Sequence, residues 1–191
     1  DRLQALARAE VRRTGRDPAA RRIARMYLRL FSDAAVCFRD RYNKNLVAAF
    51  RSFQAKGILE LITTTATHAF LPLLKLHPSS VRAQVGVGAD CAAKAFGAQP
   101  PGIWLPECGY YPGLAPMLRS AGYHYFFLET HGLLNADPAP VYDHYAPIVC
   151  DGGIAAFCRD PAASRQVWSS TEGYPGDPVY RDFHADAGHE I

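Results

Sequence analysis

Apolar residues in the first third of the chain recur every three or four positions, the spacing of one face of an α-helix. Asp17-Pro18 precedes the longest series and provides a capping carboxylate and a proline suited to a first helical turn. The members of this series are Ile23, Tyr27, Leu30, Ala34, Phe38 and Tyr42. The pattern predicts a short helix before Gly15, a long helix from Asp17, and a further helical stretch from Leu46 to Lys56.

From residue 57 onward the pattern changes to short apolar runs that alternate with helical stretches. We predict strands at 58–66, 103–106, 123–128, 146–150 and 154–157, and helices at 81–96 and 114–121. Strand, helix and strand in succession are typical of parallel βα units. Residues 131–145 are polar and proline-rich, which predicts a loop, and the last 25 residues favour irregular structure.

Composition and length describe an ordinary globular chain. The 191 residues are 49% hydrophobic and 20% charged, which excludes a disordered or collagen-like protein. No apolar run reaches the roughly 18 residues of a membrane-spanning helix, so no membrane partner is expected. The sequence starts at Asp1, has its first methionine at Met26 and stops after a motif-dense stretch, so we expect a piece of a longer protein.

Charge is distributed unevenly along the chain. Residues 1–56 hold 14 Lys and Arg against 5 Asp and Glu, and the remainder is acidic. A basic segment is compatible with nucleic-acid binding. Here the basic residues are interleaved with apolar ones at helical spacing, which instead indicates solvated helix faces. We therefore expect no nucleic-acid partner.

The five cysteines are widely spaced and contain no C-x-x-C, and the seven histidines show no H-E-x-x-H. This spacing predicts neither a disulfide framework nor a metal site, and no cofactor is implied. Free thiols are typical of a reducing compartment, which favours a cytoplasmic protein.

Polar side chains follow three of the predicted strands: His68, Glu107 and Glu129. Parallel βα architectures form their active sites at the carboxyl ends of the strands. Glu107 follows a very short strand that contains Trp104 and is itself followed by two tyrosines. Flat rings stack on sugar faces while carboxylates take sugar hydroxyls, so Glu107 is a candidate catalytic residue, and a capping or ion-paired glutamate is the alternative.

Three stretches together resemble glycoside hydrolase family 57. Residues 101–112, PGIWLPECGYYP, are similar to the W-L-P-E-C motif of that family. Residues 60–74 are similar to its upstream strand-and-histidine motif, and residues 157–184 to a segment of its 1,4-α-glucan branching enzyme branch. The order and approximate spacing of the motifs match over about residues 20–190.

The resemblance implies an α/β fold that is part of an incomplete (β/α)7 TIM-like barrel with inserted helices. Residues 1–56 would be a helical segment packed on the barrel. Residues 57–191 would be its central portion, without the first strand and the downstream part. The implied activity is a retaining glycosyltransferase that cleaves α-1,4 links through a glycosyl-enzyme on Glu107 and forms α-1,6 branches in glycogen-like polymers. The acid/base of the family lies far downstream, so this piece alone should be inactive.

The resemblance also implies roles in binding an α-1,4-glucan such as amylose or glycogen. His68 would line the subsite of the attacked sugar, Arg159 and Gly176 would bind substrate, and Trp168 would stack near the cleavage point, with Trp104 beside the nucleophile. Each residue has a plainer interpretation. His68 could be a structural histidine hydrogen-bonded at a strand end, and Arg159 could form an ion pair with its neighbour Asp160. Trp168 could be a core residue, and Gly176 could be a turn residue.

Several alternatives stay open at this point. Residues 130–147 are shorter than the loop that branching enzymes of the family carry with a tyrosine, and neither Tyr142 nor Tyr145 is assigned to that role. A short loop favours an α-glucan hydrolase of the α-amylase type, or a 4-α-glucanotransferase, from the same family. A non-catalytic glucan-binding protein is a second alternative. A polysaccharide deacetylase-like barrel would need metal-ligand spacing that the sequence lacks.

Overall fold

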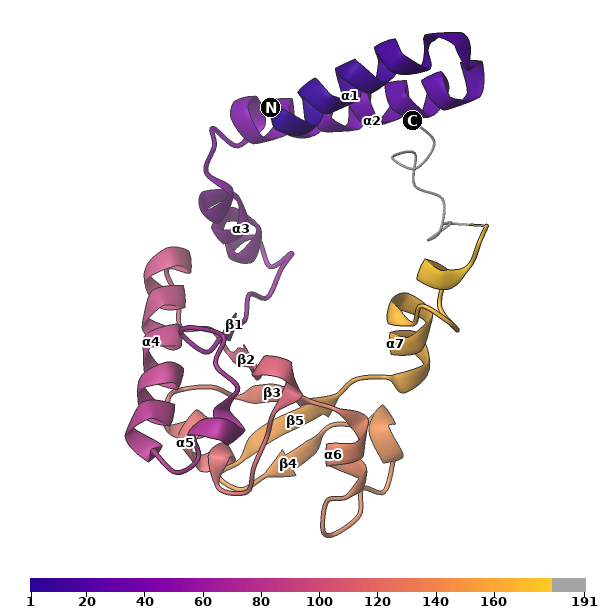
Figure 1. Ribbon diagram of the computed structural model, residues 1–191. Coiled ribbons are helices and arrows are strands. Elements are labelled where there is room, and N and C mark those ends of the chain that lie inside the picture. The colour runs from indigo at the N-terminus through magenta and orange to yellow at the C-terminus, as the bar shows by residue number, and fades with distance from the viewer. Residues whose placement is uncertain (180–191) are drawn as a thin grey trace. The chain divides into compact units, whose positions relative to one another are not determined.

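The computed structural model describes residues 1–179 of the protein (Figure 1). The chain divides into two compact units, of which the first is Asp1–Glu60 and the second begins at Leu61. Among the described residues, every helix is too short or too polar to cross a lipid bilayer.

The first unit is helical, as the apolar spacing predicts. Helix α1 (Arg2–Arg13) and helix α2 (Pro18–Val36) pack on each other across the 3₁₀ turn η1 (Thr14–Arg16). The Asp17 carboxylate accepts hydrogen bonds from two backbone N–H groups of the first turn of α2, at 2.9 and 3.0 Å. A π-helical turn, η2 (Cys37–Arg41), ends α2, and α3 (Leu46–Ala55) follows.

The second unit contains a five-stranded sheet of order β1-β2-β3-β5-β4. Four strands run parallel: β1 (Thr63–Thr64), β2 (Gly102–Trp104), β3 (Tyr125–Leu128) and β5 (Ile154–Cys158). Strand β4 (Ile148–Cys150) pairs antiparallel with β5 across a tight turn. The mixed α/β class with parallel pairing is thus confirmed, and closure into a (β/α)7 barrel stays a prediction.

Helices α4 (Pro78–Phe96) and α5 (Leu114–Ser120) connect β1 to β2 and β2 to β3. The core is made by alternate strand residues and by the apolar faces of these two helices. Its fully buried members include Ile103, Phe126, Ile154, Val81, Leu114 and Leu118. Side chains alternate between the two faces of a sheet, so the strand residues next to these buried ones point to the opposite face. There they form a row of aromatic rings. This aromatic row consists of Trp104, Tyr125, Phe127 and Phe157, with ring centroids 5.6–6.1 Å apart.

Three local expectations differ from the structure. The predicted strand 58–66 pairs only at Thr63–Thr64, since the backbone N–H of Ala66 bonds to the Gln84 carbonyl of α4 instead of a strand. The predicted loop 131–145 begins with helix α6 (Thr130–Leu134), which buries Leu133, and ends with the 3₁₀ turn η5 (Asp143–Tyr145). Helix α7 (Pro161–Trp168) was not predicted, and the 3₁₀ turn η6 (Tyr174–Gly176) follows it.

Candidate active site

Two of the predicted site residues meet where neighbouring parallel strands end. His68 follows β1 and Glu107 follows β2, and the His68 Nε2 atom lies 2.8 Å from the Glu107 Oε1 atom. The His68 side chain is 55% exposed and the Glu107 side chain 73% exposed. The pair is therefore open to solvent in the described part of the chain.

A tight turn directs Glu107 away from the core. The turn η4 (Pro106–Cys108) follows β2 after Leu105, and the Cys108 N–H donates to the Leu105 carbonyl at 2.6 Å. Cys108 has a left-handed φ of +57°, which costs about 1–2 kcal/mol for a residue with a side chain. Leu105 and Cys108 are buried on either side of Glu107, so the carboxylate projects while its neighbours hold the turn.

The same turn packs against the segment that carries His68. A Cβ atom added to Gly109 would overlap the ring of Phe70, which lies two residues beyond His68. Only glycine allows this close approach without movement of the ring. The segments that follow β1 and β2 are thereby held together at the His68–Glu107 pair.

Helix α4 shapes the turn that carries His68. The His68 N–H donates to the Thr65 carbonyl at 3.0 Å, and His68 has a left-handed φ of +55°. The Gln84 side chain accepts from the Thr67 N–H at 3.0 Å and donates to the Thr67 hydroxyl at 2.9 Å. These bonds fix the turn and with it the direction of the imidazole.

Thr64 is a site residue that the sequence did not reveal. Its hydroxyl donates to the Trp104 carbonyl at 3.0 Å and lies 3.2 Å from the Nδ1 atom of His68. Thr64 thus joins β1, β2 and the imidazole. The signal for it was weak, because three consecutive threonines in a β-branched run look equivalent in sequence.

Arg159 pairs with Glu129 and not with Asp160. The Arg159 Nη1 atom lies 2.7 Å from the Glu129 Oε1 atom, and both side chains are about one-third exposed. The Cys108 thiol is beside this pair, and burial, with the Glu129 charge as a smaller contribution, raises its pKa to about 11. Cys108 therefore links the Glu107 turn to the ends of β3 and β5.

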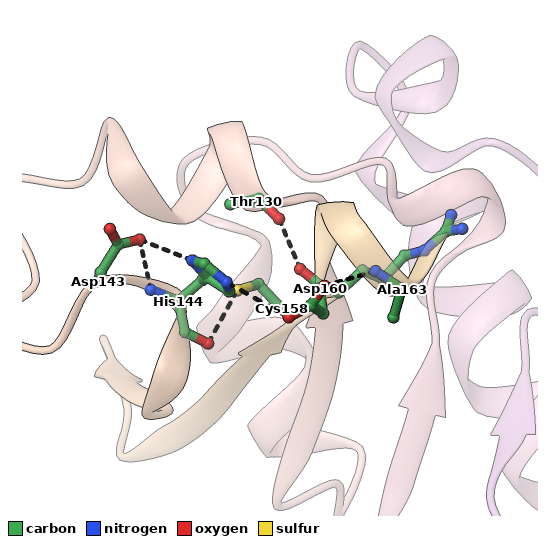
Figure 2. A network of polar contacts seen from close by, with 7 residues as sticks. Thr130, Asp143, His144, Cys158, Asp160 and Ala163 are labelled. Carbon is green, nitrogen blue, oxygen red and sulfur yellow. Dashed lines mark hydrogen bonds and ion pairs between the residues drawn. The ribbon is translucent and has the colours of Figure 1, made fainter. Parts of the chain in front are cut away.

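Asp160 belongs to a polar network at the end of β5 (Figure 2). It caps α7 by accepting from the Ala163 N–H at 2.7 Å, which lowers the pKa of Asp160. Its other oxygen lies 3.6 Å from the Nε2 atom of His144, whose Nδ1 atom is 2.8 Å from Asp143. The His144 contact lowers the pKa of Asp143. This network ties the 3₁₀ turn of the 131–145 region to the start of α7.

The remaining predicted residues lie on the strands and beyond them. Trp104 contacts Phe127 in the aromatic row, next in sequence to Leu105 and the Glu107 turn. Trp168 ends α7 with 77% of its surface exposed. Gly176 lines a separate pocket of about 540 Å³ with Gln166 and neighbouring residues. In the described part of the chain, the polar contact of Glu107 is with His68 and not with these residues.

Residues 180–184 of the branching-enzyme-like segment lie outside the described residues. Among residues 1–179, no three His, Cys, Asp or Glu side chains gather in an arrangement that holds a metal ion.

Comparisons of the sequence and of the fold place the chain in a carbohydrate-active enzyme family. The sequence profile of glycosyl hydrolase family 57 matches residues 6–186, and the chain belongs to that family. The 1,4-alpha-glucan branching enzyme TK1436 of Thermococcus kodakarensis is 33% identical over 174 residues, covering 76% of this chain and 25% of that protein.

Solved structures agree with the family assignment. The alpha-amylase AmyC from Thermotoga maritima superposes with a TM-score of 0.88 at 43% identity, over 99% of this chain and 36% of that chain. The GH57-type branching enzyme from Pyrococcus horikoshii superposes with a TM-score of 0.82 at 32% identity, over 96% of this chain and 36% of that chain. The chain thus spans about a quarter to about a third of the length of these relatives.

Proposed function

We propose that this chain carries the nucleophile of a retaining α-glucan glycosyltransferase, and that Glu107 is that nucleophile. The observation that carries the proposal is the exposed Glu107–His68 pair at the ends of two adjacent parallel strands. Membership of glycosyl hydrolase family 57 supports chemistry on glycosidic bonds.

In the proposed reaction a Glu107 oxygen attacks the anomeric carbon of an α-1,4-linked glucose. The carbon–oxygen bond to the next sugar breaks, and a second carboxylic acid gives its proton to the departing 4-oxygen. The resemblance assigns that acid to a position far downstream. An acceptor hydroxyl then loses its proton to the second residue, which is now a carboxylate. The acceptor oxygen displaces Glu107, and this second displacement restores the α configuration.

The proposed substrate binding rests on the aromatic row and on the Arg159–Glu129 ion pair. The aromatic row offers flat apolar surfaces of the kind on which sugar rings stack. We place Trp104 and His68 in the subsite of the attacked sugar. Arg159, Trp168 and Gly176 bind further glucose units in this proposal, on the part of a (β/α)7 barrel that residues 57–191 form. Residues 1–56 form a helical segment of the same protein in this proposal.

Branching is the transfer that we favour, with the 6-hydroxyl of a second glucan chain as acceptor. Its support is that the relative from Thermococcus kodakarensis is named a branching enzyme and that the sequence of residues 157–184 resembles the branching-type segment. Hydrolysis is the second candidate. The likeness to the alpha-amylase AmyC at 43% identity favours it, and water would then replace the acceptor hydroxyl.

The experiment incubates the full-length protein that contains this chain with amylose. The numbers of new α-1,6 links and of new reducing ends are then measured. Branching predicts new α-1,6 links with few new reducing ends, and hydrolysis predicts the reverse. Glu107→Gln should abolish both products. Glu10→Gln removes the same charge from an exposed residue paired with Arg13 in the first unit and should leave the rate unchanged. Unchanged turnover by Glu107→Gln would refute the proposed nucleophile.

A further inference from the structure

The Thr64 hydroxyl has a single hydrogen atom, and its surroundings decide where that hydrogen points. The Trp104 carbonyl oxygen, 3.0 Å away, carries no hydrogen and can only accept. The contact is therefore favourable only when the Thr64 hydroxyl donates to it. The hydroxyl then presents a lone pair to the Nδ1 atom of His68 at 3.2 Å.

An acceptor facing Nδ1 requires a hydrogen on that nitrogen. A neutral imidazole carries only one N–H, so its other nitrogen, Nε2, would then present a lone pair. Nε2 faces the Glu107 Oε1 atom at 2.8 Å, and an ionised carboxylate is also only an acceptor. Two acceptors at that distance repel, so the contact requires one further proton between Nε2 and Oε1.

We infer that Thr64 is a positioning residue that keeps the hydrogen of His68 on Nδ1, so that the His68–Glu107 contact is made through one additional shared proton. Its catalytic meaning rests on the proposed function of Glu107. With Glu107 ionised for attack, that proton resides on His68, which becomes an imidazolium bonded to the carboxylate.

This arrangement acts on both halves of the proposed reaction. In the first half, the imidazolium N–H holds one carboxylate oxygen while the other oxygen attacks. In the second half, the bond from the sugar carbon to Glu107 breaks and its electron pair returns to the carboxylate. The Nε2–H group stabilises that returning charge, so it favours departure of Glu107. No proton is transferred in either step by His68.

A change of tautomer is the measurable consequence. Thr64→Val keeps the β-branched shape and removes the hydroxyl, so Nδ1 loses its acceptor. Neutral His68 can then place its hydrogen on Nε2 and donate directly to the Glu107 carboxylate. Thr64→Ser keeps a hydroxyl and should behave as the unaltered protein. Thr63→Val is the matched control, since the Thr63 hydroxyl contacts the carbonyls of Thr64 and Gly88 and not the imidazole.

The test is a pH titration of the full-length protein labelled with ¹⁵N in histidine, with His68 assigned by its loss in His68→Gln. At alkaline pH, the ¹⁵N chemical shifts of His68 should place the hydrogen on Nδ1 in the unaltered protein, in Thr64→Ser and in Thr63→Val. Thr64→Val should show it at Nε2. An Nε2–H tautomer in the unaltered protein, or the same tautomer in Thr64→Val, would overturn the inference.

A second variant tests the inference if Thr64→Val does not fold. Glu107→Gln introduces an amide N–H that donates to the Nε2 lone pair, so neutral His68 should keep its hydrogen on Nδ1. An Nε2–H tautomer in Glu107→Gln would also contradict the role of Thr64. These measurements need no turnover. They therefore test the role of Thr64 separately from the proposed enzyme activity.

Discussion

Two glycines on the same helix provide a test of how α4 holds the site segment. A Cβ atom at Gly88 would overlap the Thr64 carbonyl oxygen and lie 3.3 Å from the Ala66 nitrogen, both of them backbone atoms. A Cβ atom at Gly86 would meet nothing within 4 Å. We therefore predict opposite effects for Gly88→Ala and Gly86→Ala, although both positions are helical.

The expected magnitude follows from two opposing effects. Replacing glycine by alanine inside a helix adds about 1 kcal/mol of stability through backbone entropy, and both variants gain it. Overpacking against rigid neighbours costs about 1–3 kcal/mol, and only Gly88→Ala incurs it. The free energies of unfolding of the two variants should thus differ by about 1–3 kcal/mol, with Gly86→Ala the more stable.

Denaturant unfolding of the full-length protein gives the stability difference, and turnover of amylose gives its effect on the site. Gly88→Ala must push α4 away from the segment that carries Thr64 and His68, so its kcat should fall while Gly86→Ala keeps the original rate. Equal unfolding midpoints for the two variants would refute the close packing of α4 on β1. A destabilised Gly88→Ala protein with full activity would show that this packing does not position His68.

Three further predictions concern the residues around the strand ends. Arg159→Met leaves Glu129, whose side chain is 38% exposed, without its ion pair and should lower stability by up to about 1 kcal/mol, measured by thermal unfolding; an unchanged midpoint would show that the pair contributes nothing. Because burial raises the pKa of Cys108 to about 11, iodoacetamide should label Cys108 far more slowly than the exposed Cys91 near neutral pH, and equal rates in peptide mass spectra would contradict this. The cap lowers the folded-state pKa of Asp160, so its ionised form stabilises α7 at neutral pH and this stabilisation is lost as the pH falls through that lowered pKa. Asp160→Asn should therefore make unfolding midpoints less sensitive to acid, and equal acid sensitivity would count against this cap.

The helices were predictable where a local end signal accompanied a clear apolar face. Asp17-Pro18 marks the start of α2, and Gly97, with a left-handed φ of +80°, ends α4 as a C-terminal glycine does. The same type of start signal, Asp160-Pro161, precedes α7, but the residues that follow it gave no apolar periodicity to accompany it. Local start and stop signals were therefore sufficient only together with a clear apolar face.

Site geometry was less accessible, because it depends on contacts between segments far apart in sequence. The rule that parallel strands end at one edge indicated His68 and Glu107, which lie 2.8 Å apart in the structure. It did not indicate Thr64, since strand register decides which threonine faces the imidazole. An ion pair of Arg159 with its neighbour Asp160 was the plainer alternative to substrate binding. The structure uses Asp160 as a helix cap, and Arg159 pairs with Glu129 instead.

The most direct test of the account is to trap the glycosyl-enzyme. The full-length protein is treated with an activated fluorinated α-glucosyl substrate that forms the covalent intermediate faster than it breaks down, and its peptides are then analysed by mass spectrometry. We predict an added sugar mass on the peptide that contains Glu107, and its absence in Glu107→Gln. A stable adduct on any other carboxylate, such as Glu129, would contradict the assignment of Glu107 as the nucleophile.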